Sequence, residues 1–527
     1  MHPSNKLYLL AVDTIGIQKY IFSSNRLREN IGASHLVASV TGQWAFDAVR
    51  EATDKHNVRN DDCVVDDSVT IDQPATAAEV LYSGGGNFVV LFRGEEVVKA
   101  FTRTLSRRVL AEAPGLRLMI HSIPFVLGED ALGEKLNQLF KEIKERRSTQ
   151  SNVMPIAGLG VTVMCRSTGL PAVGTPTISE PYVASAEVLA KIAAADGANV
   201  RLSRDLPPGD GHTYPLDLDD LGRTPGESSL IAVVHADGDG IGKKIEEIGN
   251  NYPQPHQLRG HIDHLRGFSD MLAEASRNAL KGTVSYFWQL AKASKEVAEL
   301  FAELFKKQYI PFRPLVFGGD DVTFVSDGRI GLALVLKYLE EFQAASGLTA
   351  CAGVAIVKSH YPFARAYELA EELCQSAKAY RRTSDATNCY LDWHFTTSGI
   401  YGDLKEIRQR EYAVSAGSLT LRPVSAFGSD TRSWETIAAG LKAFQGEAWR
   451  EKRNKAKMLR EKLRGGRPVV QEFETLYGQE LPSINGFEHG WSADADGYSG
   501  YFDAIELMDL YLPLLQEEKV NEPDAAS

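Results

Sequence analysis

The stretch SLIAVVHADGDGIGKKIEEIG, residues 229–249, carries the pattern that decides the fold. An apolar run, Leu230–Val234, leads into a turn of Asp and Gly and then into a segment of helical character. Residues 314–325, PLVFGGDDVTFV, add two short apolar runs joined by glycines. Near-continuous apolar runs are typical of central strands covered by helices, and glycines supply the positive φ that a tight hairpin needs. This half of the chain is predicted to contain a strand, a helical region and a hairpin.

The same order recurs near the N-terminus. Residues 7–22, LYLLAVDTIGIQKYIF, again combine an apolar run, an Asp, a turn with Gly and a helix-like segment, and residues 80–92, VLYSGGGNFVVLF, follow as a hairpin. A coincidence between two generic units is the alternative, but both parts recur in the same order at comparable separation. We therefore predict an α+β fold with two related domains, one in each half of the chain.

Composition limits the classes of protein that fit. The 527 residues carry a formal net charge of −12, so affinity for nucleic acid would have to come from a local patch. Residues 449–467 are the most basic stretch and are either a contact for RNA or a small protein subunit, or a solvated helix surface. The five cysteines form no CxxC pair, which indicates buried free thiols. Without a long apolar run or a secretory signal, we expect a cytoplasmic protein with no membrane partner.

Four carboxylates stand at two points that a palm-type sheet places side by side. Asp237 and Asp239 follow an apolar strand, and Asp320 and Asp321 lie in the predicted hairpin turn. Carboxylates gathered in this way repel one another unless cations neutralise them, and oxygen ligands of this kind select Mg²⁺ or Mn²⁺. Two such ions can activate a hydroxyl and neutralise a leaving pyrophosphate. Either motif alone would fit an ordinary turn, because Asp and Gly dominate turns, but the two together favour a catalytic metal site.

Glycines and basic residues complete the predicted nucleotide site. Gly238, Gly240, Gly318 and Gly319 let the backbone approach a triphosphate without Cβ collisions. A helix predicted after Pro362 ends with three basic residues, Lys378, Arg381 and Arg382. These residues either complement the helix dipole or, in the case of Lys378, bind the triphosphate.

Four further residues are weaker candidates for this site. Lys243 and Lys244 could bind phosphate or belong to a solvated helix face. His235 and His360 are interpreted as structural, with the positioning of a nucleotide as the alternative.

The order of motifs along the chain resembles the large palm-domain subunit of type III CRISPR effector complexes, the cyclic oligoadenylate synthase family. The matching pieces, which span nearly the whole chain in the family's order, are DTIGIQKYIF with LRENIGASHLVA, SGGGNFVVLF, CRSTGLPAV, HADGDGIGK, FGGDD, YPFARAYELAEELCQSAK with LDWHFTTSG, and LTLRPVSAFG.

This resemblance implies two ferredoxin-like palm domains, each an antiparallel sheet with helices on one face, packed face to face around ATP. The implied divisions are a non-catalytic, nucleotide-binding first palm at 1–125, a connector with a degenerate zinc element at 126–225, a second palm with the GGDD site at 226–400 and a C-terminal helical domain at 401–527.

The resemblance also implies roles for individual residues. Asp237 and Asp321 would be metal ligands, the Gly238 carbonyl could add another, and Asp320 would be a ligand or activate the 3′-hydroxyl. Lys378 would contact the triphosphate. The predicted nucleotide-binding residues are Gly84, Gly85, Gly86, Gly238, Gly318, Gly319, Lys243, Lys378 and Arg381. The first hairpin reads GGGN, ending at Asn87, so that half retains Asp13 but lacks paired acids.

Two departures from the family pattern matter. No HD-type nuclease domain precedes the first palm, so DNA cleavage is not expected, and the zinc element has shrunk to Cys165, so no structural zinc is expected.

The leading hypothesis is an enzyme that joins ATP into cyclic oligoadenylates with Mg²⁺ or Mn²⁺. A scaffold subunit of a ribonucleoprotein, a stand-alone cyclase making another cyclic nucleotide and a nucleotide-binding sensor remain open. CRISPR effector subunits and guide or target RNA are the expected macromolecular partners.

Overall fold

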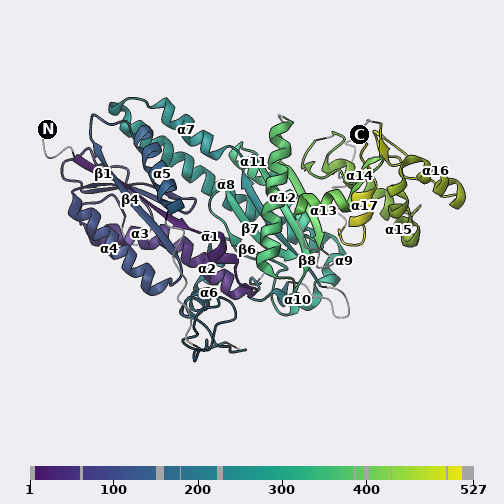
Figure 1. Cartoon of the computed structure of the whole chain (residues 1–527), viewed down its shortest axis with the longest axis horizontal. Helices are drawn as coiled ribbons and strands as arrows, with labels where there is room; N and C mark the ends of the chain where they lie inside the picture. Colours follow the sequence, from purple (N-terminus) through teal and green to yellow (C-terminus); the bar gives the residue numbers. More distant parts are fainter. Residues whose placement is uncertain are drawn as a thin grey trace, which may run out of the picture.

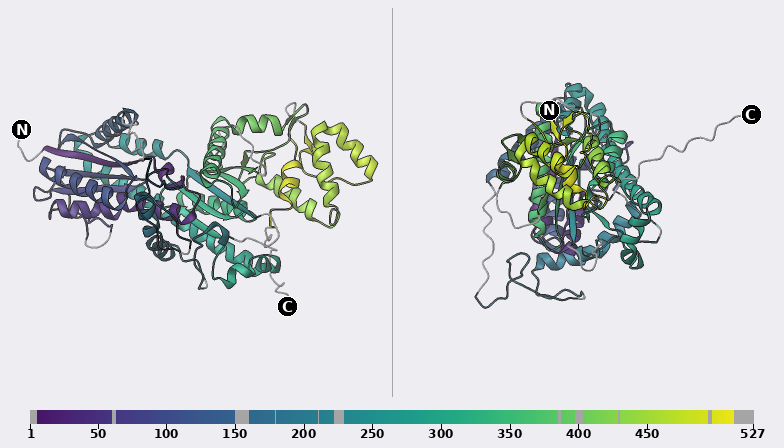
Figure 2. Two further views of the ribbon diagram at one scale, coloured as in Figure 1. Left: turned by 60° about the horizontal axis from the view of Figure 1, so that its bottom comes forward. Right: turned by 90° about the vertical axis from the view of Figure 1, so that its right-hand side faces the viewer.

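The computed structural model describes residues 6–59, 63–149, 160–178, 180–209, 211–221, 229–384, 387–396, 403–428, 430–493 and 497–512. Figure 1 shows the first sheet with the N-terminus at one end, the second sheet in the middle and the C-terminal helices at the other end. Figure 2 confirms this order along the long axis from a second direction.

The first sheet contains four strands, β1 (Lys6–Ile15), β2 (Ala78–Gly84), β3 (Asn87–Arg93) and β4 (Arg117–Val126). Their order is β2-β3-β1-β4 and every neighbouring pair is antiparallel, which is the ferredoxin-like arrangement. The helices of this half are α1 (Ile17–Phe22), α2 (Leu27–Thr41), α3 (Gln43–Ala52), α4 (Glu95–Glu112) and α5 (Leu132–Thr149). The connecting region adds α6 (Ala186–Asp205).

The second sheet repeats the pattern and extends it. Its order is β12-β9-β8-β5-β7-β6, and the pairs β6–β7, β7–β5 and β5–β8 are antiparallel, whereas β8–β9 is parallel. The strands are β5 (Leu230–Gly238), β6 (Phe312–Val316), β7 (Asp321–Asp327), β8 (Ala350–Lys358), β9 (Tyr390–Thr396) and β12 (Val424–Ser425). The helices are α7 (Ile241–Asn251), α8 (Leu258–Ala293), α9 (Lys295–Leu300), α10 (Ala302–Lys306), α11 (Gly331–Ser346) and α12 (Phe363–Thr383). The predicted α+β class with two ferredoxin-like sheets is confirmed.

The C-terminal part consists of short helices and two-residue strand pairs. These elements are α13 (Leu404–Glu411), β10 (Ala413–Val414), β11 (Gly417–Ser418), α14 (Trp434–Gln445), α15 (Arg453–Lys462), α16 (Gly466–Tyr477), β13 (Phe487–Glu488), β14 (Trp491–Ser492) and α17 (Phe502–Leu507). The basic stretch forms α15 and the residues around it. Among the described residues, no helix combines the length and the apolar character that crossing a membrane requires.

Helices cover both faces of each sheet, which differs from the expectation of helices on one face. On β5, Ala232 and Val234 pack into the core shared with α8 and α11, while Ile231 and Val233 pack into the core shared with α12. The reason is visible in the sequence, because β5 is apolar on both of its faces. In the first sheet, α3 and α4 cover one face and α5 covers the other.

The 36-residue helix α8 joins the two halves. Its first residues, including Leu258 and Ile262, pack against the first sheet, whereas Leu272 and Leu280 belong to the core of the second sheet. A helix of this length spans about 54 Å at 1.5 Å per residue, so it reaches across both domains.

The prediction of buried thiols is confirmed for four of the five cysteines. Cys165, Cys351, Cys374 and Cys389 are buried, but Cys63 is exposed.

Helix α12 lies unusually close to β8 because Gly353 has no side chain. A Cβ atom at Gly353 would lie 2.0 Å from the carbonyl oxygen of Ala370 and 2.4 Å from the backbone nitrogen of Cys374. Both contacts are with helix backbone, which cannot rotate away. Gly353 is thus what allows α12 to carry Lys378 down to the end of β5.

We predict that Gly353→Ala lowers the free energy of unfolding by about 1–3 kcal/mol, because the added methyl group pushes α12 off the sheet. Thermal unfolding followed by circular dichroism measures the change. Gly267→Ala is the matched control, since a Cβ at that exposed position of α8 meets nothing within 4 Å. The control should gain about 0.5–1 kcal/mol from helix propensity. Equal stability of Gly353→Ala and the wild type would contradict this account of the packing.

Three buried histidines make stability depend on pH. Burial lowers the pKa of His235 and of His261 to about 4, and that of His394 to about 3. The nearby Arg422 guanidinium further lowers the pKa of His394. All three side chains are therefore neutral in the folded protein at pH 7, whereas the unfolded chain binds protons below about pH 6.5.

We predict that the contribution of these three histidines to stability is full above pH 6.5 and falls as the pH is lowered from 6.5 toward 4, because only the unfolded state gains these protons. Each histidine contributes about 1.4 kcal/mol per pH unit across that range. Urea unfolding at pH 7.0 and 5.5 measures the decrease in the free energy of unfolding. In His394→Gln this decrease should be smaller by the contribution of one histidine. An unchanged pH slope in this variant would show that His394 is not the buried neutral group described.

Candidate functional site

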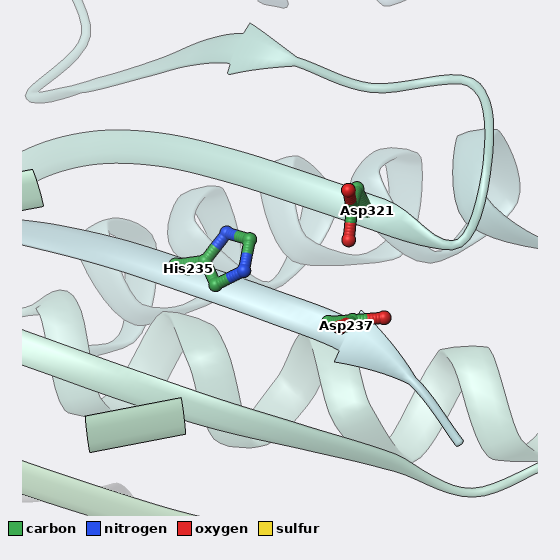
Figure 3. A group of neighbouring side chains, drawn as sticks. All are labelled: His235, Asp237 and Asp321. Carbon is green, nitrogen blue, oxygen red and sulfur yellow. The ribbon is translucent and has the colours of Figure 1, made fainter. Parts of the chain in front are cut away.

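The register between β5 and β7 brings two predicted metal ligands together. Asp237 lies directly opposite Asp321 at the ends of the antiparallel pair, although the two are far apart in sequence. Figure 3 shows both carboxylates on this strand pair, with His235 further along β5. One ligand atom from each of these three side chains lies within 4.8 Å of the others. The side-by-side arrangement expected of a palm-type sheet is therefore present.

Mutual repulsion and burial perturb the acids of this site. Loss of hydration first, and the charge of Asp237 second, raise the pKa of Asp320. Loss of hydration and the charges of Asp237 and Asp320 raise the pKa of Asp321, whose side chain still reaches solvent. A raised pKa means that these carboxylates are costly to ionise together. Positive charge placed beside them would stabilise their ionised form.

Lys378 supplies one positive charge at this point. Its ammonium group forms an ion pair with Asp237 and donates a hydrogen bond of 3.3 Å to the carbonyl oxygen of Gly238. Burial acts to lower the pKa of Lys378, but Asp237 raises it, and the net result is a raised pKa. Lys378 is therefore a charged lysine held at the end of β5 by α12.

A second ion pair, not foreseen from the sequence, lies beside the first. The Asp239 carboxylate lies 3.5 Å from Arg381 Nε and accepts a hydrogen bond of 3.2 Å from Cys351 Sγ. Its backbone N–H donates to the carbonyl oxygen of Thr349. Asp239 thus binds Arg381 and the start of β8, and among the described residues it is not part of the group of His235, Asp237 and Asp321. Asp239 follows Gly238, the last residue of β5, so the alternation of the strand no longer fixes the direction of its side chain.

The glycine hairpins of the two halves approach each other closely. A Cβ at Gly319 would lie 3.6 Å from the Cα of Gly85, so the GGDD and GGGN turns lie next to each other. In the first hairpin, Gly85 and Gly86 have φ angles of 58° and 77°, which a two-residue turn requires and side chains disfavour. Gly238 is also confined, because a Cβ there would lie 3.1 Å from the Cβ of Asp320. The hairpin turns of both sheets therefore meet at the candidate site.

The first sheet carries the counterpart of the carboxylate pair without its second acid. Asp13 on β1 lies opposite Asn87 on β3, in the same relation as Asp237 to Asp321. Asp13 instead forms an ion pair with Arg147 of α5, which also donates to the carbonyl oxygen of Thr14. The Arg147 guanidinium thus balances the charge of Asp13, which has Asn87 and not a second acid opposite it.

Three weaker candidates lie on α7 and in the turn before α12. Lys243 is exposed in the first turn of α7, and Lys244 pairs with Glu247. His360 is exposed in the turn before α12. Within the described part of the chain, none of these three has a recorded contact with the acidic cluster.

The donor set fits a hard divalent cation. Asp237, Asp320 and Asp321 offer carboxylate oxygens, and the Gly238 carbonyl already receives the Lys378 ammonium, so it faces positive charge. Carboxylate and carbonyl oxygens are the ligands that Mg²⁺ and Mn²⁺ prefer. The raised pKa values of Asp320 and Asp321 indicate that such a cation would relieve their repulsion.

The comparisons with known proteins agree with this geometry. Residues 230–386, which include β5 to α12, match the family model of the Cas10/Cmr2 second palm domain. This segment is therefore similar to the second palm domain of Cas10/Cmr2 proteins. The resemblance to the large subunit of type III CRISPR complexes, stated on the sequence motifs, is therefore confirmed at this palm domain. No curated protein matches the chain.

Solved structures extend the likeness of fold to nearly the whole chain. A Csm1-Csm4 cassette in complex with pppApApA matches with a TM-score of 0.53 and 13% identity, covering 96% of this chain and 69% of that chain. The Csm1-Csm4 cassette in complex with cA4 and the apo cassette each match with a TM-score of 0.50 and 14% identity, covering 96% of this chain and 70% of the other. At these identities the likeness concerns the fold.

We predict that Asp321→Asn raises the melting temperature of the metal-free protein by a few degrees, because it removes one of three repelling charges. The same variant should lose the rise in melting temperature that Mn²⁺ gives the wild type. Differential scanning fluorimetry in EDTA and in MnCl₂ measures both effects. Glu274→Gln, which removes an exposed acid from α8, is the charge-matched control and should behave as the wild type. A full Mn²⁺ response in Asp321→Asn would contradict the assignment of this ligand.

Proposed function

We propose that this chain is a cytoplasmic, metal-dependent nucleotidyltransferase that converts ATP into cyclic oligoadenylates in antiviral defence, within or related to a type III CRISPR effector complex. The observation that carries the proposal is the opposed pair Asp237 and Asp321, with Lys378 at the same point, inside a segment similar to the Cas10/Cmr2 second palm domain.

The reaction would join nucleotides through their 3′ and 5′ positions. The 3′-hydroxyl oxygen of one ATP attacks the α-phosphorus of a second, a P–O bond forms, and the bond between the α-phosphorus and the bridging oxygen breaks. The hydroxyl proton is lost and pyrophosphate leaves. Repetition of this step on the growing chain, and finally on its own 5′ end, gives a ring.

The acids and the Gly238 carbonyl would hold the metal. Asp237, Asp320 and Asp321 are the proposed carboxylate ligands, for two ions of Mg²⁺ or Mn²⁺. Divalent ions bound there would lower the pKa of the 3′-hydroxyl and neutralise charge on the leaving pyrophosphate. Asp320, whose pKa is raised and whose Cβ lies next to Gly238, is also the proposed acceptor of the hydroxyl proton.

The remaining proposed residues would hold the nucleotides. Lys378 would exchange part of its contact with Asp237 for the triphosphate, as a point charge suited to phosphate oxygens. Gly318 and Gly319 would admit the phosphates close to the backbone, and Arg381 and Lys243 would add charge nearby. Gly84, Gly85 and Gly86 would receive the acceptor nucleotide against the first sheet. No metal is proposed there, because Asp13 pairs with Arg147 and has Asn87 opposite it in place of a second acid.

Partners of the proposed enzyme follow from two observations. Two solved structures of similar fold are Csm1-Csm4 cassettes in complex with cA4 and with pppApApA, which supports ATP as substrate, adenylate oligomers as products and a second CRISPR subunit as partner. The basic residues of α15 and its flanks are exposed or half-buried and are the proposed contact for RNA or a small subunit.

We predict that purified protein with ATP and Mn²⁺ or Mg²⁺, with and without target RNA and effector subunits, releases pyrophosphate and forms adenylate oligomers. Mass spectrometry of the products identifies chain length and ring closure, and EDTA should abolish the activity. Asp320→Asn/Asp321→Asn should lower turnover by about 10³-fold or more, because the metal-dependent stabilisation is lost.

Lys378→Met separates substrate binding from folding in the same assay. It should weaken ATP binding and turnover, whereas Lys244→Met, which removes an exposed lysine paired with Glu247, should leave both unchanged. The absence of products under every condition would favour a scaffold subunit. Products with another base would favour a different cyclic nucleotide.

A further inference from the structure

A histidine completes the acidic cluster at the end of β5. His235 precedes Asp237 by two residues, so both side chains project from the same face of the strand. A ring nitrogen of His235 and carboxylate oxygens of Asp237 and Asp321 lie within 4.8 Å of one another. The side chain of His235 is buried, with 3% of its surface exposed. In Figure 3 its ring lies on the same strand pair, with the nitrogen-bearing edge turned toward the carboxylates.

Two contacts fix the orientation of this imidazole. Its Nδ1 lies 3.3 Å from Thr323 Oγ1, the hydroxyl of the residue directly opposite on β7. The ring of Tyr367 on α12 packs edge to face against it at 5.7 Å between centroids. In the part of the chain that the structure describes, Nε2 has no recorded hydrogen-bond partner. A histidine held through one ring nitrogen by a neighbouring polar group presents the other nitrogen in the manner of a metal ligand.

We propose that His235 binds a divalent cation through Nε2, together with Asp237 and Asp321, and that it biases the site toward Mn²⁺ over Mg²⁺. The inference rests on the cation site of the proposed function but not on turnover of ATP.

The geometry and the ligand chemistry support this set of three. An ion about 2.1 Å from each donor separates neighbouring donors by about 3.0 Å and opposite donors by about 4.2 Å, so donors within 4.8 Å of one another reach it by a shift of at most about 1 Å per side chain. Imidazole nitrogen suits the later first-row metals best, but Mn²⁺ accepts it more readily than Mg²⁺, which prefers oxygen ligands and retains its water. A site of three oxygens would discriminate less between the two ions.

A purely structural role for His235 is the competing account. In that case the hydrogen bond to Thr323 and the packing on Tyr367 would suffice, and the ring would keep its nitrogen away from any bound ion. The two accounts differ in one measurable property, a direct bond between metal and nitrogen.

The test uses the full-length protein labelled with ¹⁵N only in histidine. Mn²⁺ is added without nucleotide, and pulsed electron paramagnetic resonance detects ¹⁵N nuclei bound directly to the ion. We expect ¹⁵N coupling in the wild type and in His360→Gln, which removes an exposed histidine outside the site, and no coupling in His235→Gln. Competition titration should give a ratio of Mn²⁺ to Mg²⁺ affinity that falls by at least about tenfold in His235→Gln.

The outcomes separate the inference from the proposed function. Bound Mn²⁺ without ¹⁵N coupling in the wild type overturns the role of His235 and leaves the oxygen site and its chemistry intact. No Mn²⁺ binding at all overturns both. Because the decisive spectrum is that of the wild type, the result does not depend on whether His235→Gln folds.

Discussion

The pairing of β5 with β7 is the constraint on which the candidate site depends. Antiparallel register sets Asp237 opposite Asp321, and a slip of one residue would send either side chain to the other face of the sheet. The apolar residues behind them prevent such a slip, because Val233 and Val325 are buried in one core and Val234 and Phe324 in the other. The hydrophobic layers of the sheet thus hold two repelling carboxylates in contact.

The approach of α12 to β8 serves the same site from the other side. Gly353 lets the helix backbone come close to the sheet, and the helix then delivers Lys378 to Asp237 and Arg381 to Asp239. The site therefore carries charges of both signs, with acids from the strands and bases from the helix. This distribution suits a substrate that brings both phosphate charge and metal ions.

The two halves have the same sheet order but different electrostatics. At the position that corresponds to Asp321, the first sheet has Asn87, and Arg147 pairs with Asp13. The hairpins of both halves nevertheless lie next to each other at Gly85 and Gly319. Such an arrangement suits one half that performs metal chemistry and one that binds a partner nucleotide, with α8 packed against both sheets.

The sequence by itself determined the fold class, the repeated sheet and the acids, because apolar runs, glycine turns and GGDD are local patterns with local physical meaning. It also pointed to Lys378 through its place on the last turns of a helix. Only the tertiary structure decided that Asp239 turns to Arg381 and Cys351, that Cys63 is exposed, that helices cover both faces of each sheet and that His235 joins the carboxylates. These properties depend on which residues other elements bring into contact, and neither spacing nor composition encodes that distance.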